Sequence, residues 1–195
     1  MEMEKRVIQF AADYINRINL GVSINLEIIS LYRKVYELVT ERFPDKKHSE
    51  ALDGLFELSL KIQGCMYGHP EPDRLLENVL IPRVINVTSE IDKRTSKSYK
   101  KHLDKLMKDL KESENPIKTK EIYLEIYLIL TFLIIYSVEE LFMNRIEKDP
   151  EIKANEEIQT QLEMVEKFKY FAGEIVEFVA IELLEELKLL NIVKY

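Results

Sequence analysis

An uncharged apolar run near the middle of the chain, Ile126–Val138, limits the fold more than any other feature. The run is 13 residues long, with Glu125 before it and Glu139 after it. A helix needs about 20 apolar residues to cross a bilayer, so this run is too short for a membrane span. A short helix that is apolar on all sides must instead be surrounded by protein. The run therefore predicts the central helix of a bundle, or part of an oligomer interface, and no membrane association.

The rest of the sequence favours long helices joined by few turns. Only 5 glycines and 6 prolines occur among 195 residues, and the periodic segments are rich in Leu, Glu and Lys, which are strong helix formers. Hydrophobic residues at 46% and charged residues at 32% are typical of a globular chain. We predict an all-α fold, a single domain over residues 1–195. It would be a bundle of five to seven helices with a central apolar helix and a long C-terminal amphipathic helix.

Glycine, proline and capping residues set the expected helix boundaries. Gly21 is expected to end the first helix, and Pro82 to break or kink the fourth. The stretch Gly64–Asp73 contains two glycines and two prolines and is expected to form a loop. The expected helices cover residues 3–19, 24–43, 49–64, 73–113, 116–147 and 151–192. Ser49 is expected to cap the third of these, and Asn115–Pro116 and Asp149–Pro150 are expected to open the fifth and sixth.

The sequence also indicates a cellular compartment. A single cysteine, Cys65, excludes an internal disulfide and fits a reducing cytosol. The charged first residues lead into an amphipathic pattern rather than an apolar segment, so no signal peptide is expected. The predicted location is therefore cytoplasmic. Abundant Lys, Glu and Ile with no Trp are compatible with a thermophilic source.

Eight basic residues share one side of a single predicted helix. At about 100° per residue they occupy an arc of roughly 140°, opposite an apolar arc that contains Leu103, Leu106 and Leu110. Residues 92–120 hold ten basic and five acidic residues, although the chain as a whole has a net charge of −7. We name this group the basic face; it comprises Lys93, Arg94, Lys97, Lys100, Lys101, Lys105, Lys108 and Lys111.

Cations in a row along a helix can follow the phosphates of a nucleic-acid backbone. Seven of the eight are lysines, which read bases less well than arginine, and no aromatic residue shares the face for base stacking. We therefore predict a non-enzymatic binding or adaptor protein without a cofactor. Its basic face would contact nucleic acid without sequence preference, or an acidic protein. The simplest alternative is a solvated helix face without a partner.

The last predicted helix carries an acidic stripe that is itself a candidate partner for the basic face. Its glutamates Glu163, Glu166, Glu174 and Glu177 lie within an arc of about 80°. They could cover the lysines within one protomer or across a dimer. The apolar stripe on the same helix and the apolar central helix favour a homo-oligomer, most simply a dimer. That stripe comprises Val165, Phe168, Val176, Val179, Leu183, Leu187 and Leu190.

The same glutamates suggest an enzymatic alternative. Glu-x-x-Glu pairs on facing helices hold Mg²⁺ in some all-α phosphohydrolases, because Mg²⁺ prefers oxygen ligands. Here, however, Glu166 and Glu174 are eight residues apart, about 12 Å along one helix, and cannot share an ion. A small divalent-metal-dependent phosphohydrolase remains the alternative function. Because the glutamates of this one helix cannot share an ion, no metal ligand or catalytic residue is assigned.

The loop Gly64–Asp73 is a second place where chemistry is conceivable. Cys65 and His69 are four residues apart, and acidic residues follow closely. A zinc site needs about four ligands, and a catalytic cysteine needs a base held nearby. With one Cys and three His in the chain, a rigid turn between helices is the simpler interpretation.

Overall fold

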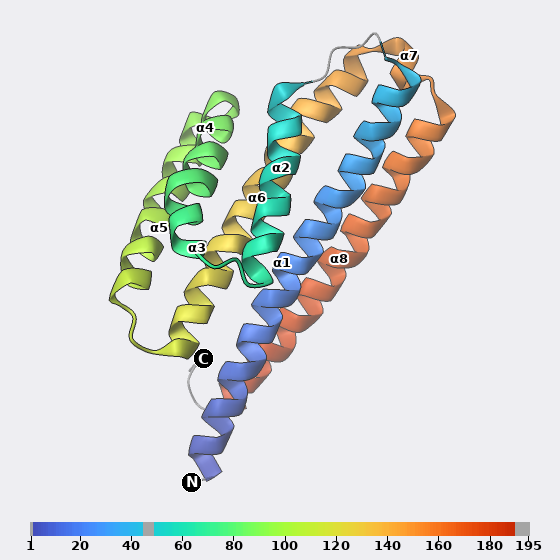
Figure 1. Ribbon diagram of the computed structural model, residues 1–195. Coiled ribbons are helices and arrows are strands. Elements are labelled where there is room, and N and C mark those ends of the chain that lie inside the picture. Colours follow the sequence, from blue (N-terminus) through green and yellow to red (C-terminus); the bar gives the residue numbers. More distant parts are fainter. Residues whose placement is uncertain (1, 45–48, 190–195) are drawn as a thin grey trace.

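The computed structural model describes residues 2–44 and 49–189, with side chains from 13–44 and 49–175. These described residues form helices and no strands, which confirms the all-α prediction. Six of the helices have eleven residues or more, within the predicted five to seven. Figure 1 shows them running alternately up and down, as short connections between helices require. The elements are α1 (Glu2–Arg42), α2 (Glu50–Met66), α3 (Pro72–Leu75), the π-helix η1 (Leu76–Leu80), α4 (Ile81–Ile91), α5 (Lys93–Glu112), α6 (Pro116–Lys148), α7 (Pro150–Lys153) and α8 (Glu156–Leu189).

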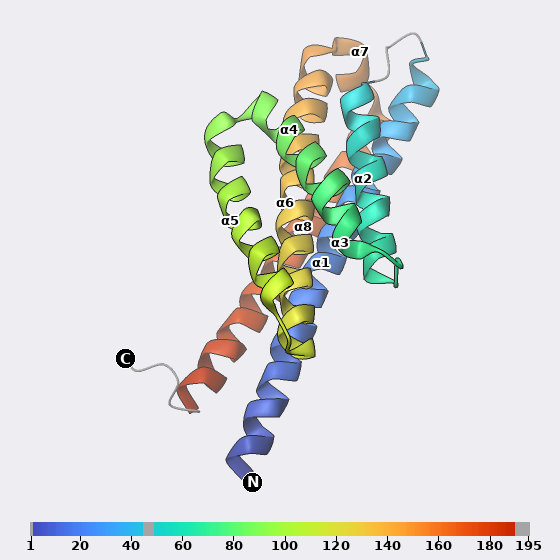
Figure 2. The same cartoon turned by 60° about the vertical axis from the view of Figure 1, so that its left-hand side comes forward.

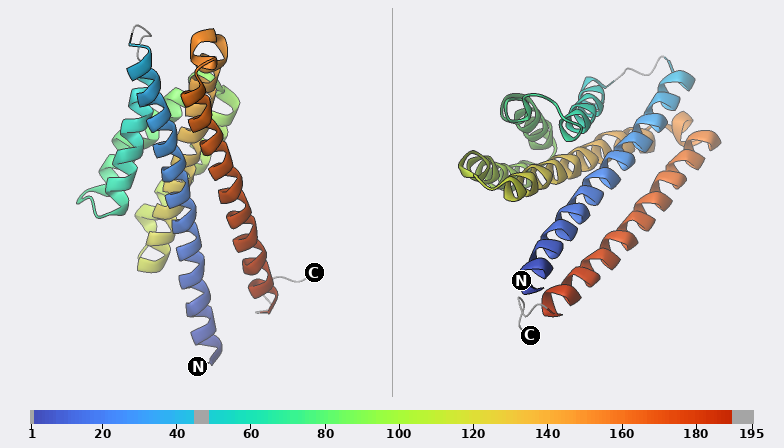
Figure 3. Two further views of the ribbon diagram at one scale, coloured as in Figure 1. Left: turned by 90° about the vertical axis from the view of Figure 1, so that its right-hand side faces the viewer. Right: turned by 60° about the horizontal axis from the view of Figure 1, so that its bottom comes forward.

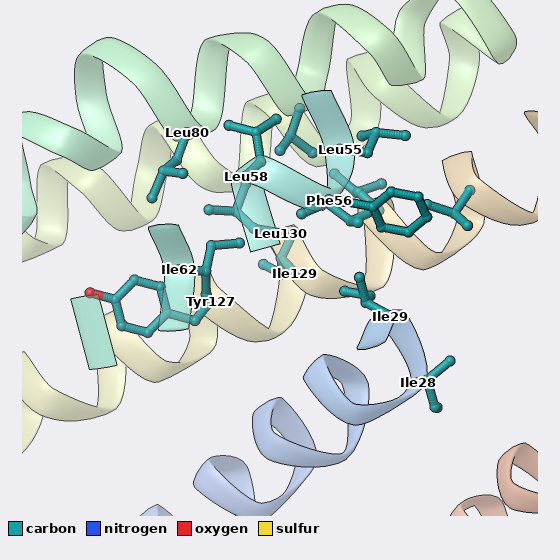
Figure 4. Close-up of a cluster of buried hydrophobic side chains, with 14 of the residues drawn as sticks. Ile28, Ile29, Leu55, Phe56, Leu58, Ile62, Leu80, Tyr127, Ile129 and Leu130 are labelled. Carbon is teal, nitrogen blue, oxygen red and sulfur yellow. The ribbon is translucent and has the colours of Figure 1, made fainter. Parts of the chain in front are cut away.

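Helix α6 is the predicted central helix and contains the apolar run. It packs against α1, α2, α4 and α5, and its buried side chains point in several directions around the helix axis. Figure 4 shows Leu55 and Leu58 of α2 in the same buried cluster as Leu130 of α6. By length and composition alone α6 could cross a membrane, and more than half of its most apolar 18-residue stretch is buried inside the protein.

Helix α1 is a single helix through Gly21, so the predicted end at residue 19 is wrong. The reason is a close approach between two helices. A Cβ added at Gly21 would lie 3.3 Å from Cδ1 of Leu128 on α6. Glycine therefore allows a close approach of α1 and α6 at this point and does not form a turn. One turn further along, Asn25 Nδ2 donates a 3.1 Å hydrogen bond to Thr131 Oγ1, which fixes the register of α1 against α6.

Three features in the middle of the chain also differ in detail from the prediction. Pro82 has no N–H, and just before it the amide of Ile81 donates to the carbonyl of Leu76, giving the wider turn of a π-helix. The expected helix 73–113 is also divided at Asp92, which ends α4 and caps α5. The loop predicted over Gly64–Asp73 is shorter than expected, because α2 continues to Met66 and α3 begins at Pro72.

Helix α8 is the predicted long C-terminal helix and packs along α1. Its predicted start at residue 151 is wrong: α8 begins at Glu156, because Asn155 accepts a hydrogen bond from the amide of Ile158 and separates α8 from the short α7. In the apolar stripe, Val165 is buried and Phe168 partly buried, whereas the stripe residues from Val176 onward lie outside the described side chains. Figure 3 shows the first part of α1 and the last part of α8 extending beyond the other helices. The dimer stays a prediction.

Candidate functional site

The basic face lies on α5, whose two sides differ sharply. Asp92 caps the helix by accepting hydrogen bonds from the amides of Arg94 and Thr95, at 2.9 and 3.2 Å. The opposite side is buried against α4 and α6. Its buried residues are Ser96, Leu103, Leu106, Met107 and Leu110. Because this apolar side fixes the rotation of α5, the cations on the other side must face outward.

All eight cations of the basic face are exposed. Figures 1 and 2 show α5 at one edge of the molecule, so the face borders solvent along the whole helix. Two of the eight form ion pairs, Lys108 with Glu112 at 3.8 Å and Lys111 with Glu77 at 2.8 Å. The other six form no ion pair within 4 Å of a carboxylate among the described residues. The face is therefore open, with its ion pairs confined to its C-terminal half.

Two exposed acidic residues, Asp104 and Glu112, interrupt the basic face, and the helical arc drawn from the sequence did not take them into account. Asp104 is exposed and falls about 20° from Lys97 around the helix axis. The first half of α5 carries no such interruption between Lys93 and Lys101. The most strongly positive part of the surface is therefore the first two turns of α5.

The described part of the acidic stripe does not cover the basic face within one protomer. Helix α8 lies against α1, on the far side of the molecule from α5 (Figure 1). Glu163 pairs with Lys167 at 3.8 Å, and Glu166 pairs with Lys169 at 3.2 Å, both within α8. Glu174 is exposed, and the side chain of Glu177 lies outside the described part of the chain. Contact between stripe and basic face across a dimer stays a prediction.

A half-buried polar cluster joins α1, α6 and α8. The hydroxyl of Tyr32 donates to Oε1 of Glu139 at 2.9 Å and contacts Oε1 of Glu166 at 3.2 Å. The ammonium of Lys169 bonds to both carboxylates and lies 5.9 Å from the centre of the Tyr32 ring. Burial alone would lower the pKa of Lys169, but the two carboxylates outweigh burial and raise it. The cluster thus places one cation between two anions at the junction of three helices.

This cluster bears directly on the phosphohydrolase alternative. Glu139, on α6, places a carboxylate from a second helix beside Glu166 of α8. The sequence alone did not identify this second carboxylate. The ammonium of Lys169, however, already binds both carboxylates. Among the described residues, no three His, Cys, Asp or Glu side chains are grouped closely enough to hold a metal ion. The described geometry therefore gives metal-dependent hydrolysis no support.

The loop after α2 holds neither of the chemistries considered for it. Cys65 is buried, burial raises the pKa of its thiol, and the thiolate that a nucleophile needs is disfavoured. His69 is exposed, and its Nδ1 accepts a 3.1 Å hydrogen bond from the amide of Glu71. Gly68 has φ = 101°, a conformation that favours glycine and lets the chain turn here. The loop is a tight turn, and Cys65, in the last turn of α2 before it, lies beside Tyr127 of α6.

The raised pKa values of three buried tyrosines lead us to expect that the protein loses stability at high pH. Burial raises the pKa of Tyr32, Tyr123 and Tyr127 above the ordinary value of 10.0, and neighbouring carboxylates raise it further for Tyr32 (Glu139) and Tyr123 (Asp73). The folded state therefore keeps protons that the unfolded chain releases above pH 10, so stability is lost as the pH rises beyond that value.

We expect these three phenols to ionise together with the loss of helix, in a titration that follows phenolate absorbance and helical circular dichroism. The control is the same titration in denaturant, where all ten tyrosines should ionise in one phase. Complete ionisation of the ten tyrosines with the helical signal intact would contradict the expectation.

Comparisons of the chain with protein-family models, curated proteins and solved structures found no match. Its function is therefore inferred from its own residues.

Proposed function

We propose that this protein binds the backbone of nucleic acid, without sequence preference, through the basic face of α5. The observation that supports this proposal most is the exposure of all eight cations, six of them without a described ion pair within 4 Å. A helix of 20 residues is about 30 Å long. An extended polyanion can therefore lie along the face and meet several cations at once.

In the first half of α5 the spacing of the cations opposes the stability of the helix, which favours a functional explanation. In the second half, Asp104, Asp109 and Glu112 offset part of the positive charge. Lys93, Lys97, Lys101 and Lys105 follow one another at four-residue intervals. Each such like-charged pair costs roughly 0.2–0.5 kcal/mol. Lys93 and Arg94 also lie in the first turn, at the positive end of the helix dipole, where the N-cap carboxylate of Asp92 offsets only part of the positive charge. A bound polyanion relieves both repulsions, so backbone phosphates fit the face better than solvent alone.

Salt dependence tests the proposal. The affinity for generic duplex DNA or single-stranded RNA should fall steeply with salt, because each phosphate contact releases a counterion. Replacing Lys97, Lys101, Lys105 and Lys108 by Gln should make the slope of log affinity against log salt shallower by about 3 to 4. Affinity at about 50 mM salt should fall by at least about tenfold. Fluorescence anisotropy with labelled oligonucleotides over a salt series measures both quantities.

The matched control replaces four exposed lysines away from α5, namely Lys34, Lys148, Lys153 and Lys167. Both variants lose the same total charge, so a difference between them isolates the position of the charge. The control should bind nearly as tightly as the wild type. Equal losses in both variants, or no binding by the wild type at about 50 mM salt, would overturn the proposal.

A further inference from the structure

A cavity of about 300 Å³ lies where the first turns of α6 meet α1 and the end of α2. It is on a different part of the molecule from the basic face. Asn19 and Ser23 of α1 and Cys65 of α2 contribute to its walls, and Tyr67 and Pro72 stand where the loop after α2 passes it. Its volume is at the lower end of the range found for ligand pockets. The cavity therefore has room for one small molecule.

Helix α6 supplies an aromatic wall and a cation to this cavity. Lys120, Tyr123 and Tyr127 follow one another at spacings of three and four residues, which places them on one side of the helix. The rings of Tyr123 and Tyr127 are stacked, with centres 6.2 Å apart and planes at 20°. The sequence shows this spacing, but it does not show that these tyrosines lie opposite Cys65.

Polar bonds hold this aromatic wall in place. The hydroxyl of Tyr123 donates to Oδ1 of Asp73, at the start of α3. Tyr127 is buried and lies beside the thiol of Cys65 at the end of α2. Both rings thus contact neighbouring segments, which favours a wall that keeps its shape without a ligand. Such preorganisation lowers the entropy cost of binding.

The charged residue that lines the cavity is Lys120. It is exposed, and no ion pair within 4 Å joins it to a carboxylate among the described residues. The carboxylate of Asp73, which accepts the bond from Tyr123, stays charged but is not among the lining residues. One ammonium group matches one negative charge on a ligand, whereas a phosphate dianion would need further donors.

We propose that this cavity binds a small aromatic carboxylate, with its ring against Tyr123 and Tyr127 and its carboxylate at Lys120. The aromatic faces suit a planar ring, and the single cation suits a monoanion. Tyr67 stands at the rim with 81% of its surface exposed. From there its ring can cover a bound ligand, because the turn at Gly68 holds Tyr67 beside the cavity opening.

Cys65 makes this proposal testable, because it is the only cysteine in the chain and lines the cavity. The experiment measures the rate at which iodoacetamide alkylates Cys65 in the folded protein, by intact mass, with benzoate as the probe. Benzoate should slow the reaction several-fold and in a saturable manner. Benzyl alcohol, which lacks the charge, and cyclohexanecarboxylate, which lacks the aromatic ring, should protect Cys65 less.

Two lysine variants distinguish a specific binding site from a general attraction of anions to the positive charges of the protein. Lys120→Gln should abolish protection by benzoate. Lys118→Gln removes an equally exposed cation two residues away and should leave protection intact. A second readout is the melting temperature, which benzoate should raise in the wild type and in Lys118→Gln but not in Lys120→Gln.

The proposal fails if millimolar benzoate changes neither the alkylation rate nor the melting temperature of the wild type. It also fails if both lysine variants lose protection to the same degree. None of these outcomes depends on the basic face, whose nucleic-acid binding is measured separately.

Discussion

Replacing Ile134 by Ala is expected to lower the free energy of unfolding by about 3 kcal/mol, the typical cost of such a truncation in a packed core. Ile134 is fully buried in the middle of α6. Its removal leaves a cavity lined by side chains that cannot move in to fill it. The size of the effect tests whether α6 is a core helix in water, since by length and composition α6 could also cross a membrane.

Phe132 provides the matched control on the same helix. Its side chain is larger than that of Ile134 but is 47% exposed, and its described ring contact is with Tyr99. Phe132→Ala should therefore cost about 1 kcal/mol or less. Urea unfolding in detergent-free buffer, followed by helical circular dichroism, compares the variants through their midpoints at constant slope. A loss at Phe132 equal to that at Ile134 would mean that the exposed side of α6 is covered by something else, such as a lipid or another chain.

Local signals predicted the helix beginnings because the residues that form a cap are neighbours in sequence. Ser49 accepts from the amide of Leu52 at the start of α2, and Asn115 precedes the proline that opens α6. Asp149 also precedes a proline at the first position of a helix, but that helix is the short α7 and not the expected long C-terminal helix. The central role of α6 was also predictable, because a run that is apolar on all sides needs protein around it. Both inferences require only a few consecutive residues.

Gly21 shows why other boundaries could not be predicted. A glycine after an amphipathic segment is typical both of a helix end and of a close contact between helices. Only the position of Leu128, more than a hundred residues away, decides between them. Asp92 differs, because its capping bonds to Arg94 and Thr95 are local and the sequence contained the signal.

For the candidate sites, too, features set by neighbouring residues could be predicted, and features set by helix packing could not. The outward direction of the basic face follows from the apolar side of α5 and could be predicted. Whether α8 covers it depends on how the helices pack, and the sequence left that question open. The pairing of Glu139 with Lys169 likewise joins residues of different helices, α6 and α8. A single sequence contains no signal for such pairs.

The Tyr32–Glu139–Glu166–Lys169 cluster gives the second prediction with a large effect. Lys169→Met keeps the length of the side chain but removes the ammonium between two carboxylates. Lys169 and Glu139 are only 28% and 30% exposed, so water replaces the lost interaction poorly. We expect the free energy of unfolding at neutral pH to fall by about 2 kcal/mol, less than the cost at a fully buried pair because solvent still screens the charges.

Lys167→Met is the control, since Lys167 lies on the same helix and pairs with Glu163 at 3.8 Å while 78% exposed. An exposed pair of this kind contributes less than about 1 kcal/mol. Adding Glu139→Gln to Lys169→Met removes one of the two facing carboxylates and should recover part of the lost stability, as a double-mutant cycle by urea unfolding would reveal. If Lys169→Met costs no more than Lys167→Met, the cluster contributes no more to stability than a surface ion pair. If the double variant recovers nothing, repulsion between Glu139 and Glu166 is not what destabilises the single variant, and the loss comes instead from the contact of Lys169 with the ring of Tyr32.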